Sequence, residues 1–160
     1  RDGRDVVDSW LAAYRRGSWA LDEGAFPVTD EGREALVRWQ ASVWAYRTEV
    51  VQRAYERHPA DRRVLVRYED LVRDTAGELA RVCACLGLDV APARLAEVAA
   101  AHAYAAVPPE AKGERKEIRS ARPGGWRDNL TPDEHAVMHE VMGAKLAELG
   151  YLDAAPVGSG

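Results

Sequence analysis

The stretch RRVLVRYEDLVRDTAGELARVCACLGL, residues 62–88, carries the clearest fold signal of this 160-residue chain. The aliphatic run Val64–Val66 is typical of a short buried strand, and the letters YEDL follow it as a turn into a helix. Hydrophobic residues then recur at helical spacing, and Gly87 stands where the end of a helix favours glycine. The pattern predicts one strand that leads directly into a helix.

Upstream, the chain opens with RDGRDVVDSW, in which Arg1 and Ser9 stand eight positions apart. Asp5 is a candidate N-cap of a helix, with Arg1 in the loop before it. An anion at this point would meet the positive end of the helix dipole, the guanidinium group of Arg1 and the hydroxyl group of Ser9. The spacing therefore predicts a phosphate site. The apolar stripe of this helix is predicted at Val6, Trp10 and Ala13.

Downstream, the segment RSARPGGWRDNLTPDE runs from Arg119 to Glu134. Residues 112–127 hold a local excess of positive charge in a chain whose formal net charge is -4. Such an excess indicates an anion site rather than a general nucleic-acid surface. The cations are Lys112, Arg115, Lys116, Arg119, Arg122 and Arg127, against Glu114 and Glu117.

Together, these three segments resemble the nucleotide-binding motifs of sulfotransferases that depend on 3'-phosphoadenylyl sulfate (PAPS), in particular the C-terminal portion of bacterial-type members. YEDL after a strand matches one passage of that family. Arg119, Gly124 and Trp126, followed by a helix start at Thr131, match the family's RKGxxGDW segment. Three matches in the same order span almost the whole chain. The departures are Ser120 and Ala121 in place of the motif's lysine and glycine, and Gly125 in place of its aspartate.

The resemblance implies a set of residues that bind the nucleotide. Arg1, Ser9 and Arg119 would hold the 3'-phosphate, with Ser120 offering one hydrogen bond where the family has a charged lysine. Tyr68 and Tyr104 would lie near the adenine, where a phenol ring can stack on the base; a packed surface tyrosine is the alternative for Tyr104. PAPS is then the sulfuryl donor, adenosine 3',5'-bisphosphate is the product, and no metal is required.

The resemblance also implies the fold class. We expect an α/β parent protein with a P-loop-NTPase-like three-layer fold around a central parallel sheet, of which this chain is the mostly helical C-terminal part with one clear strand. A single strand has no partners for its own backbone groups, which fits that expectation. The general base and the 5'-phosphosulfate loop are expected upstream, so no catalytic residue is assigned in this chain.

Composition agrees with one soluble domain. A hydrophobic content of 47% in 160 residues supports one core, predicted for residues 1–152 and followed by a disordered tail at 153–160. No apolar run reaches membrane length. Cys83 and Cys85 point apart on the predicted helix, so buried thiols in a reducing cytoplasm are the default interpretation.

Further helices follow from spacing and caps. One is predicted from Pro92 to about His102, and one is predicted to start at Thr131 with a capping box to Glu134. His135 and His139 have metal-ligand spacing but no third ligand, so they are interpreted as exposed helix residues. A long helix over 31–57 is expected to bury Leu36, Trp39, Val43, Tyr46, Val50 and Ala54.

Two other functions stay open at this point. The chain can be a non-catalytic fragment that binds adenosine bisphosphate weakly or serves as a helical interaction module, or it can belong to a P-loop kinase, which shares the parent fold. The favoured interpretation has a small-molecule hydroxyl or amine acceptor as partner and no nucleic acid. Self-association through the edge of the lone strand, giving a homo-oligomer, is a further possibility.

Overall fold

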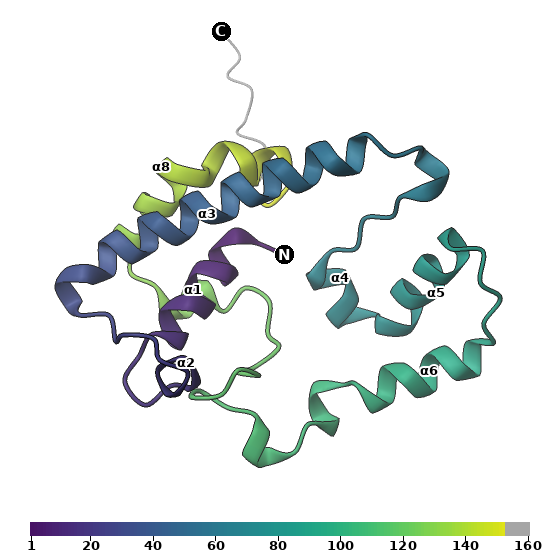
Figure 1. Cartoon of the computed structure of the whole chain (residues 1–160), viewed down its shortest axis with the longest axis horizontal. Coiled ribbons are helices and arrows are strands. Elements are labelled where there is room, and N and C mark those ends of the chain that lie inside the picture. The colour runs from purple at the N-terminus through teal and green to yellow at the C-terminus, as the bar shows by residue number, and fades with distance from the viewer. Residues whose placement is uncertain (153–160) are drawn as a thin grey trace, which may run out of the picture. The chain divides into compact units, whose positions relative to one another are not determined.

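The computed structural model describes residues 1–152, so the predicted tail at 153–160 lies outside the described residues. The described part is mostly helical (Figure 1). Its elements are α1 (Gly3–Ala13), α2 (Trp19–Asp22), α3 (Asp30–Glu56), η1 (Ala60–Arg62), α4 (Tyr68–Arg73), α5 (Thr75–Cys85), α6 (Pro92–Ala101), η2 (Tyr104–Ala106), η3 (Pro109–Ala111), α7 (Trp126–Asn129) and α8 (Pro132–Glu148).

The chain divides into two compact units. The first unit is Val50–Pro123 together with Arg1, and the second unit is Asp2–Glu49 together with the chain from Gly124 onward. The division passes through α3, between Glu49 and Val50. The prediction that residues 1–152 belong to one domain stays a prediction. In the part of the chain that the structure describes, no helix combines the length and apolar character needed to cross a bilayer.

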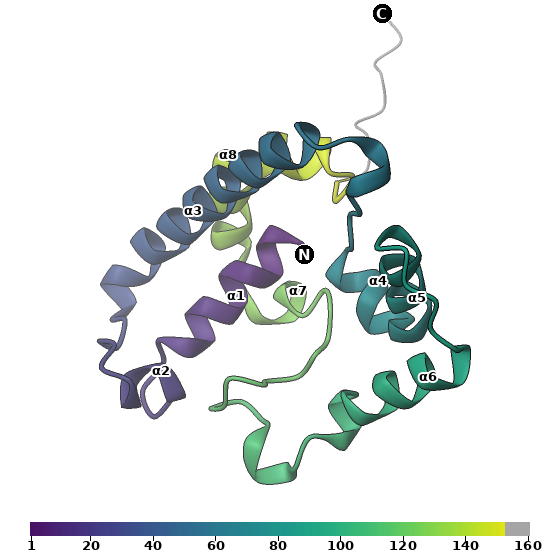
Figure 2. The same ribbon diagram turned by 45° about the vertical axis from the view of Figure 1, so that its right-hand side comes forward.

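The second unit is built on α3 and α8, which lie side by side (Figures 1 and 2). The ion pairs Arg33–Glu134 and Arg38–Glu140 advance in the same direction along both helices, so the two helices run parallel. Helices α1 and α7 complete a common core with them. Its buried members are Val7, Leu11, Val37, Ala41, Trp44, Trp126, Leu130, Met138, Met142 and Leu146.

Helix α1 begins earlier than the sequence predicted. Its N-cap is Asp2, whose side chain accepts a hydrogen bond from the backbone N–H of Arg4 at 2.9 Å, so the assignment of Asp5 as N-cap was wrong. The predicted stripe was confirmed at one position of three. Ala13 is buried as predicted, whereas Val6 and Trp10 are only half-buried, and the fully buried residues are Val7 and Leu11. Because the N-cap lies three residues upstream of Asp5, Asp5 is inside the helix and does not cap it.

The extent of α3 confirms the predicted long helix, but the predicted buried face was wrong. Val37, Ala41 and Trp44 are buried, while Trp39 and Tyr46 are 64% and 71% exposed. Both sets satisfy a spacing of three or four residues, so periodicity alone could not choose between them. The contact with α1 and α8 decides which stripe is covered.

In the first unit, residues 63–67 form an extended segment. The side chain of Arg63 bonds the carbonyl of Tyr55 at 3.1 Å, and the side chain of Arg81 bonds the carbonyl of Leu65 at 2.6 Å. No β-ladder includes this segment in the described residues, and Leu65 is 54% exposed. The strand and the parallel sheet of the parent fold therefore stay predictions.

The helix expected after YEDL is divided into α4 and α5. Asp74 ends α4 and caps α5, because its side chain accepts the backbone N–H of Gly77 at 2.9 Å. The predicted glycine cap is confirmed: Gly87 has φ +69°, and the N–H of Leu88 reaches the carbonyl of Cys83 at 2.9 Å. Helix α6 starts at Pro92 as predicted and packs against α5.

Helix α8 starts with the predicted capping box between Thr131 and Glu134. Burial acts to raise the pKa of Glu134. The side chain and charge of Arg33 and the backbone N–H of Thr131 act against it and hold the pKa below its ordinary value of 4.5. Glu134 therefore links the start of α8 to α3 as an anion.

Gly3 marks the closest approach of α1 to its neighbours. A Cβ atom at this position would lie 2.6 Å from Cδ2 of Trp44 and 2.8 Å from Sδ of Met142. We expect Gly3→Ala to lower the free energy of unfolding by about 1–3 kcal/mol in urea denaturation, the range for overpacking a core. Gly32→Ala is the matched control, because its Cβ would meet nothing closer than 3.5 Å. An equal loss in both variants would contradict the close packing.

A second prediction concerns Glu134 and pH. A carboxyl group whose pKa falls on folding stabilises the protein above its unfolded pKa, and this contribution disappears as the pH falls through the folded pKa. We expect Glu134→Gln to lower the free energy of unfolding by about 1 kcal/mol at pH 7. The difference from the wild type should shrink below pH 4.5, the ordinary pKa of this group. Denaturation at several pH values that gave a constant difference would contradict the ion pair.

Candidate functional site

Two buried acids on α1 hold a segment that is distant in sequence. The carboxylate of Asp5, which is 1% exposed, accepts the backbone N–H of Gly124 at 2.7 Å and that of Trp126 at 3.3 Å. Asp8, also 1% exposed, accepts the side-chain amide of Asn129 at 3.0 Å. We call Asp5 and Asp8 the acidic clamp. The two residues share a helix face because they are three positions apart.

Glycine is favoured at position 124 mainly by its backbone conformation, because an added Cβ atom would meet only the flexible end of the Arg127 side chain. The φ of Gly124, +83°, lies in the left-handed region, which side chains with a Cβ avoid. A Cβ atom there would also lie 2.8 Å from Nη1 of Arg127. The turn at Gly124 brings its own N–H and that of Trp126 to the same carboxylate of Asp5.

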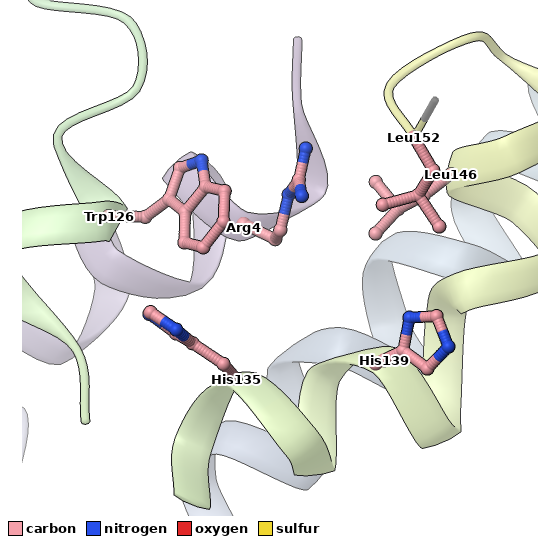
Figure 3. Close-up of a pocket in the computed structure, with 6 residues that line it drawn as sticks. All are labelled: Arg4, Trp126, His135, His139, Leu146 and Leu152. Atoms are coloured by element: carbon pink, nitrogen blue, oxygen red, sulfur yellow. The ribbon is translucent and has the colours of Figure 1, made fainter. Parts of the chain in front are cut away.

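Trp126 fixes the clamped segment in the core. Its ring is 7% exposed and lies beside two guanidinium groups, at 4.1 Å from Arg4 and 4.5 Å from Arg127. The ring of His135 meets it edge-on at 4.8 Å. Figure 3 shows Arg4 and His135 converging on the indole from different elements.

Arg4 is itself held from two sides. Its guanidinium group bonds both oxygens of Asp2, with Nη2 at 2.7 Å from Oδ2, and donates to the carbonyl of Tyr151 at 2.8 Å. Arg4 therefore ties the start of α1 to the chain that follows α8. The bidentate geometry holds the guanidinium group in place beside the ring of Trp126.

A cavity of about 200 Å³ adjoins this cluster (Figure 3). Within residues 1–152, no hydrogen-bond partner is present for Nε1 of Trp126 or Nε2 of His135, and both atoms are buried. No group of three or more potential metal ligands occurs in these residues either. The lining residues are Arg4, Trp126, His135, His139, Leu146 and Leu152.

The structure brings two pairs of the predicted nucleotide-binding residues together in the first unit. The guanidinium group of Arg1 lies 4.8 Å from the ring centre of Tyr68. The hydroxyl group of Tyr104 donates to the carbonyl of Arg119 at 2.9 Å, and the ammonium group of Lys112 lies 4.7 Å from the ring centre of Tyr104. The ammonium group of Lys112 therefore lies against the same tyrosine ring that was expected to stack on adenine.

The two predicted serines differ in exposure. Ser9 is half-buried on α1 in the second unit, and Ser120 is exposed in the first. Ser9 lies four residues after Asp5, so it shares the helix face of the acidic clamp.

The sequence did not reveal that Asp5 and Asp8 are buried hydrogen-bond acceptors, or that Lys112 contacts the ring of Tyr104. A usable signal was present for the first two: an i, i+3 pair of acids inside a helix otherwise predicted to be amphipathic. Lys112 was counted only as part of a cationic segment. Its contact with Tyr104 depends on the 3₁₀ turns between them, which the sequence did not reveal.

Ala121 adopts a strained conformation. Its φ is +47°, the only positive value at a non-glycine residue in the described chain. It stands at the position where the resembled motif has glycine, a residue that adopts a positive φ without strain. A left-handed conformation costs a residue with a Cβ about 1–2 kcal/mol.

We expect Ala121→Gly to relieve this strain. The relief is offset by about 0.4–1 kcal/mol of additional chain entropy in the unfolded state, so the free energy of unfolding should stay equal or rise by up to about 1 kcal/mol. Ala80→Gly, at an exposed position inside α5, is the matched control and should lose about 1 kcal/mol. Equal losses in thermal denaturation would contradict the left-handed turn.

Comparison with known proteins gives one family. A family model described as "Sulfotransferase family" matches residues 1–92. Neither the curated proteins nor the solved structures gave a match. The matched residues are more than half of the 160-residue chain and contain Arg1, Ser9 and Tyr68. This agrees with the resemblance predicted from the three motifs, and the chain belongs to the sulfotransferase family.

Proposed function

We propose that the protein transfers a sulfuryl group from PAPS to a hydroxyl or amine group of a small-molecule acceptor, and that this chain holds the 3'-phosphate of the donor. Membership of the sulfotransferase family supports the reaction class. The donor and the acceptor are part of the proposal. The product of the donor would be adenosine 3',5'-bisphosphate.

One contact carries the proposal. The N–H of Gly124 donates to Asp5 across 119 positions of sequence, and it fastens a residue of the RSARPGGW segment to the helix that carries Ser9. The resemblance assigns both segments to the same phosphate. The family match ends at residue 92, so this contact supports the assignment independently of it.

The proposed phosphate ligands have suitable chemistry. A phosphate dianion is stabilised by guanidinium groups, which can donate two parallel hydrogen bonds, and by a hydroxyl donor. Arg1 and Arg119 would supply the guanidinium groups, and Ser9 would supply the hydroxyl. The ring of Tyr68 beside Arg1 restrains that guanidinium group, which lowers the entropy lost on binding.

The reaction would resemble phosphoryl transfer, in which positioning and charge stabilisation dominate. The sulfur–oxygen bond to the 5'-phosphate breaks, and the sulfur forms a new bond to the oxygen of a hydroxyl acceptor or to the nitrogen of an amine acceptor. The acceptor proton passes to a general base. Within this scheme, the residues of this chain bind and orient the nucleotide.

We also propose a reducing compartment, the cytoplasm. Cys83 and Cys85 are free thiols and half-buried on α5. Unpaired cysteines are usual in cytosolic proteins, where thiols are kept reduced.

The test is nucleotide affinity. We expect Arg1→Ala and Arg119→Ala each to weaken binding of adenosine 3',5'-bisphosphate by about 1.5–3 kcal/mol in calorimetry, the range for hydrogen bonds to charged groups. Affinity for adenosine 5'-phosphate, which lacks the 3'-phosphate, should hardly change. Arg115→Ala removes an exposed cation from the same segment and is the matched control.

Two outcomes would reject the proposal. Equal losses for the two nucleotides would show that neither arginine recognises the 3'-phosphate. A loss in Arg115→Ala as large as that in Arg119→Ala would indicate only a general attraction between the cationic segment and anions.

A further inference from the structure

We infer that Asp5 is a positioning residue for the nucleotide site: its carboxylate sets where the backbone of residues 124–126 lies on the helix that carries Ser9. The inference rests on the proposed function. Asp5 would touch neither the nucleotide nor the acceptor. It would act through the N–H groups of Gly124 and Trp126, which it holds at 2.7 and 3.3 Å.

The burial of Asp5 means that its carboxylate requires hydrogen-bond donors from the protein. A carboxylate that is 1% exposed has lost most of its contact with water, so its oxygens need such donors. Backbone N–H groups from Gly124 and Trp126 supply two of them. Both groups can reach one carboxylate because the chain turns at Gly124, where φ is +83°. The carboxylate of Asp5 therefore depends on the turn at Gly124 for its two donors, and the turn depends on the carboxylate to accept its N–H groups.

The position of Asp5 connects the clamp to the phosphate site. Asp5 and Ser9 are separated by one helical turn and lie on the same face of α1. The segment that Asp5 holds belongs to the motif assigned to the same phosphate as Ser9. A shift of residues 124–126 along α1 would change where this part of the motif lies on the helix that carries Ser9.

The two acids of the clamp differ in a way that an experiment can use. Asp5 faces two backbone N–H groups, so an asparagine there would turn its own NH₂ group toward one of them and lose that hydrogen bond. Asp8 faces the side-chain amide of Asn129, and asparagine at position 8 can still offer its oxygen to that donor. Asp5→Asn and Asp8→Asn remove the same charge at equal burial, yet only the first should release the loop backbone.

We would measure binding of adenosine 3',5'-bisphosphate and adenosine 5'-phosphate to the wild type and both variants. Asp5→Asn should weaken the bisphosphate about 5- to 10-fold, as expected for the loss of one hydrogen bond, and change the 5'-phosphate less than about twofold. Asp8→Asn should change neither. Hydrogen exchange without nucleotide should rise at the amides of Gly124 and Trp126 in Asp5→Asn only, while α8 stays protected.

The other possible outcomes distinguish a failure of the inference about Asp5 from a failure of the proposed function. If the wild type binds the bisphosphate and both variants weaken it equally, or if Asp5→Asn weakens both nucleotides equally, Asp5 is a structural acid and the inference is overturned. If the wild type shows no preference for the bisphosphate, the proposed function fails, and the role of Asp5 in nucleotide binding falls with it; the exchange data would still report on the clamp.

Asp5→Glu is a second variant for the case in which Asp5→Asn does not fold. It keeps the charge but moves the carboxylate outward by one methylene group. Its affinity for the bisphosphate should lie between those of the wild type and Asp5→Asn, with exchange at Gly124 raised to an intermediate degree. A wild-type affinity in Asp5→Glu together with fast exchange at Gly124 would overturn the inference, because loop position and affinity would then be independent.

Discussion

Inside the second unit, the carboxylate of Asp5 has almost no access to water and accepts backbone N–H groups from Gly124 and Trp126. Withdrawing those donors would take two hydrogen bonds from a buried carboxylate, at a cost of several kcal/mol. The same contact holds the backbone of Trp126, whose ring packs in the core. Trp126 begins α7, which directly precedes the cap of α8 at Thr131. The position of three elements therefore follows from one acid on α1.

The other polar contacts of the second unit contribute less. The Arg38–Glu140 pair between α3 and α8 is exposed on both sides, and such pairs stabilise a protein by about 0–1 kcal/mol. Arg33–Glu134 is more buried and shares its carboxylate with the helix cap. These pairs select the register of α3 against α8, while apolar burial around Met138 and Met142 supplies most of the stability.

Local signals in the sequence predicted the ends of helices well. The capping box at Thr131, the proline start at Pro92 and the glycine at Gly87 each depend on a few adjacent residues, and all three are confirmed. The family was predicted correctly from three short motifs for the same reason, since a motif is a local pattern.

Features that depend on distant contacts were not predicted. The exposed face of α3 includes Trp39 and Tyr46, because the partners on α1 and α8 select the neighbouring stripe. The same limitation applies to Asp5: a helix cap and a buried hydrogen-bond acceptor look alike until the segment 119 positions away is placed beside it. The joint geometry of Arg1, Ser9 and Arg119 is a long-range property of this kind and stays a prediction.

In chain order, the first unit interrupts the second, because Val50–Pro123 stands between its two parts. During synthesis, α1 and α3 leave the ribosome well before α7 and α8 exist, at about 5–20 residues per second. Throughout that interval Asp5 lacks Gly124, and Val7 and Leu11 lack their partners on α8. Contacts of such sequence separation are slow to form, so the apolar faces of α1 and α3 stay uncovered for several seconds, an interval in which aggregation competes with folding.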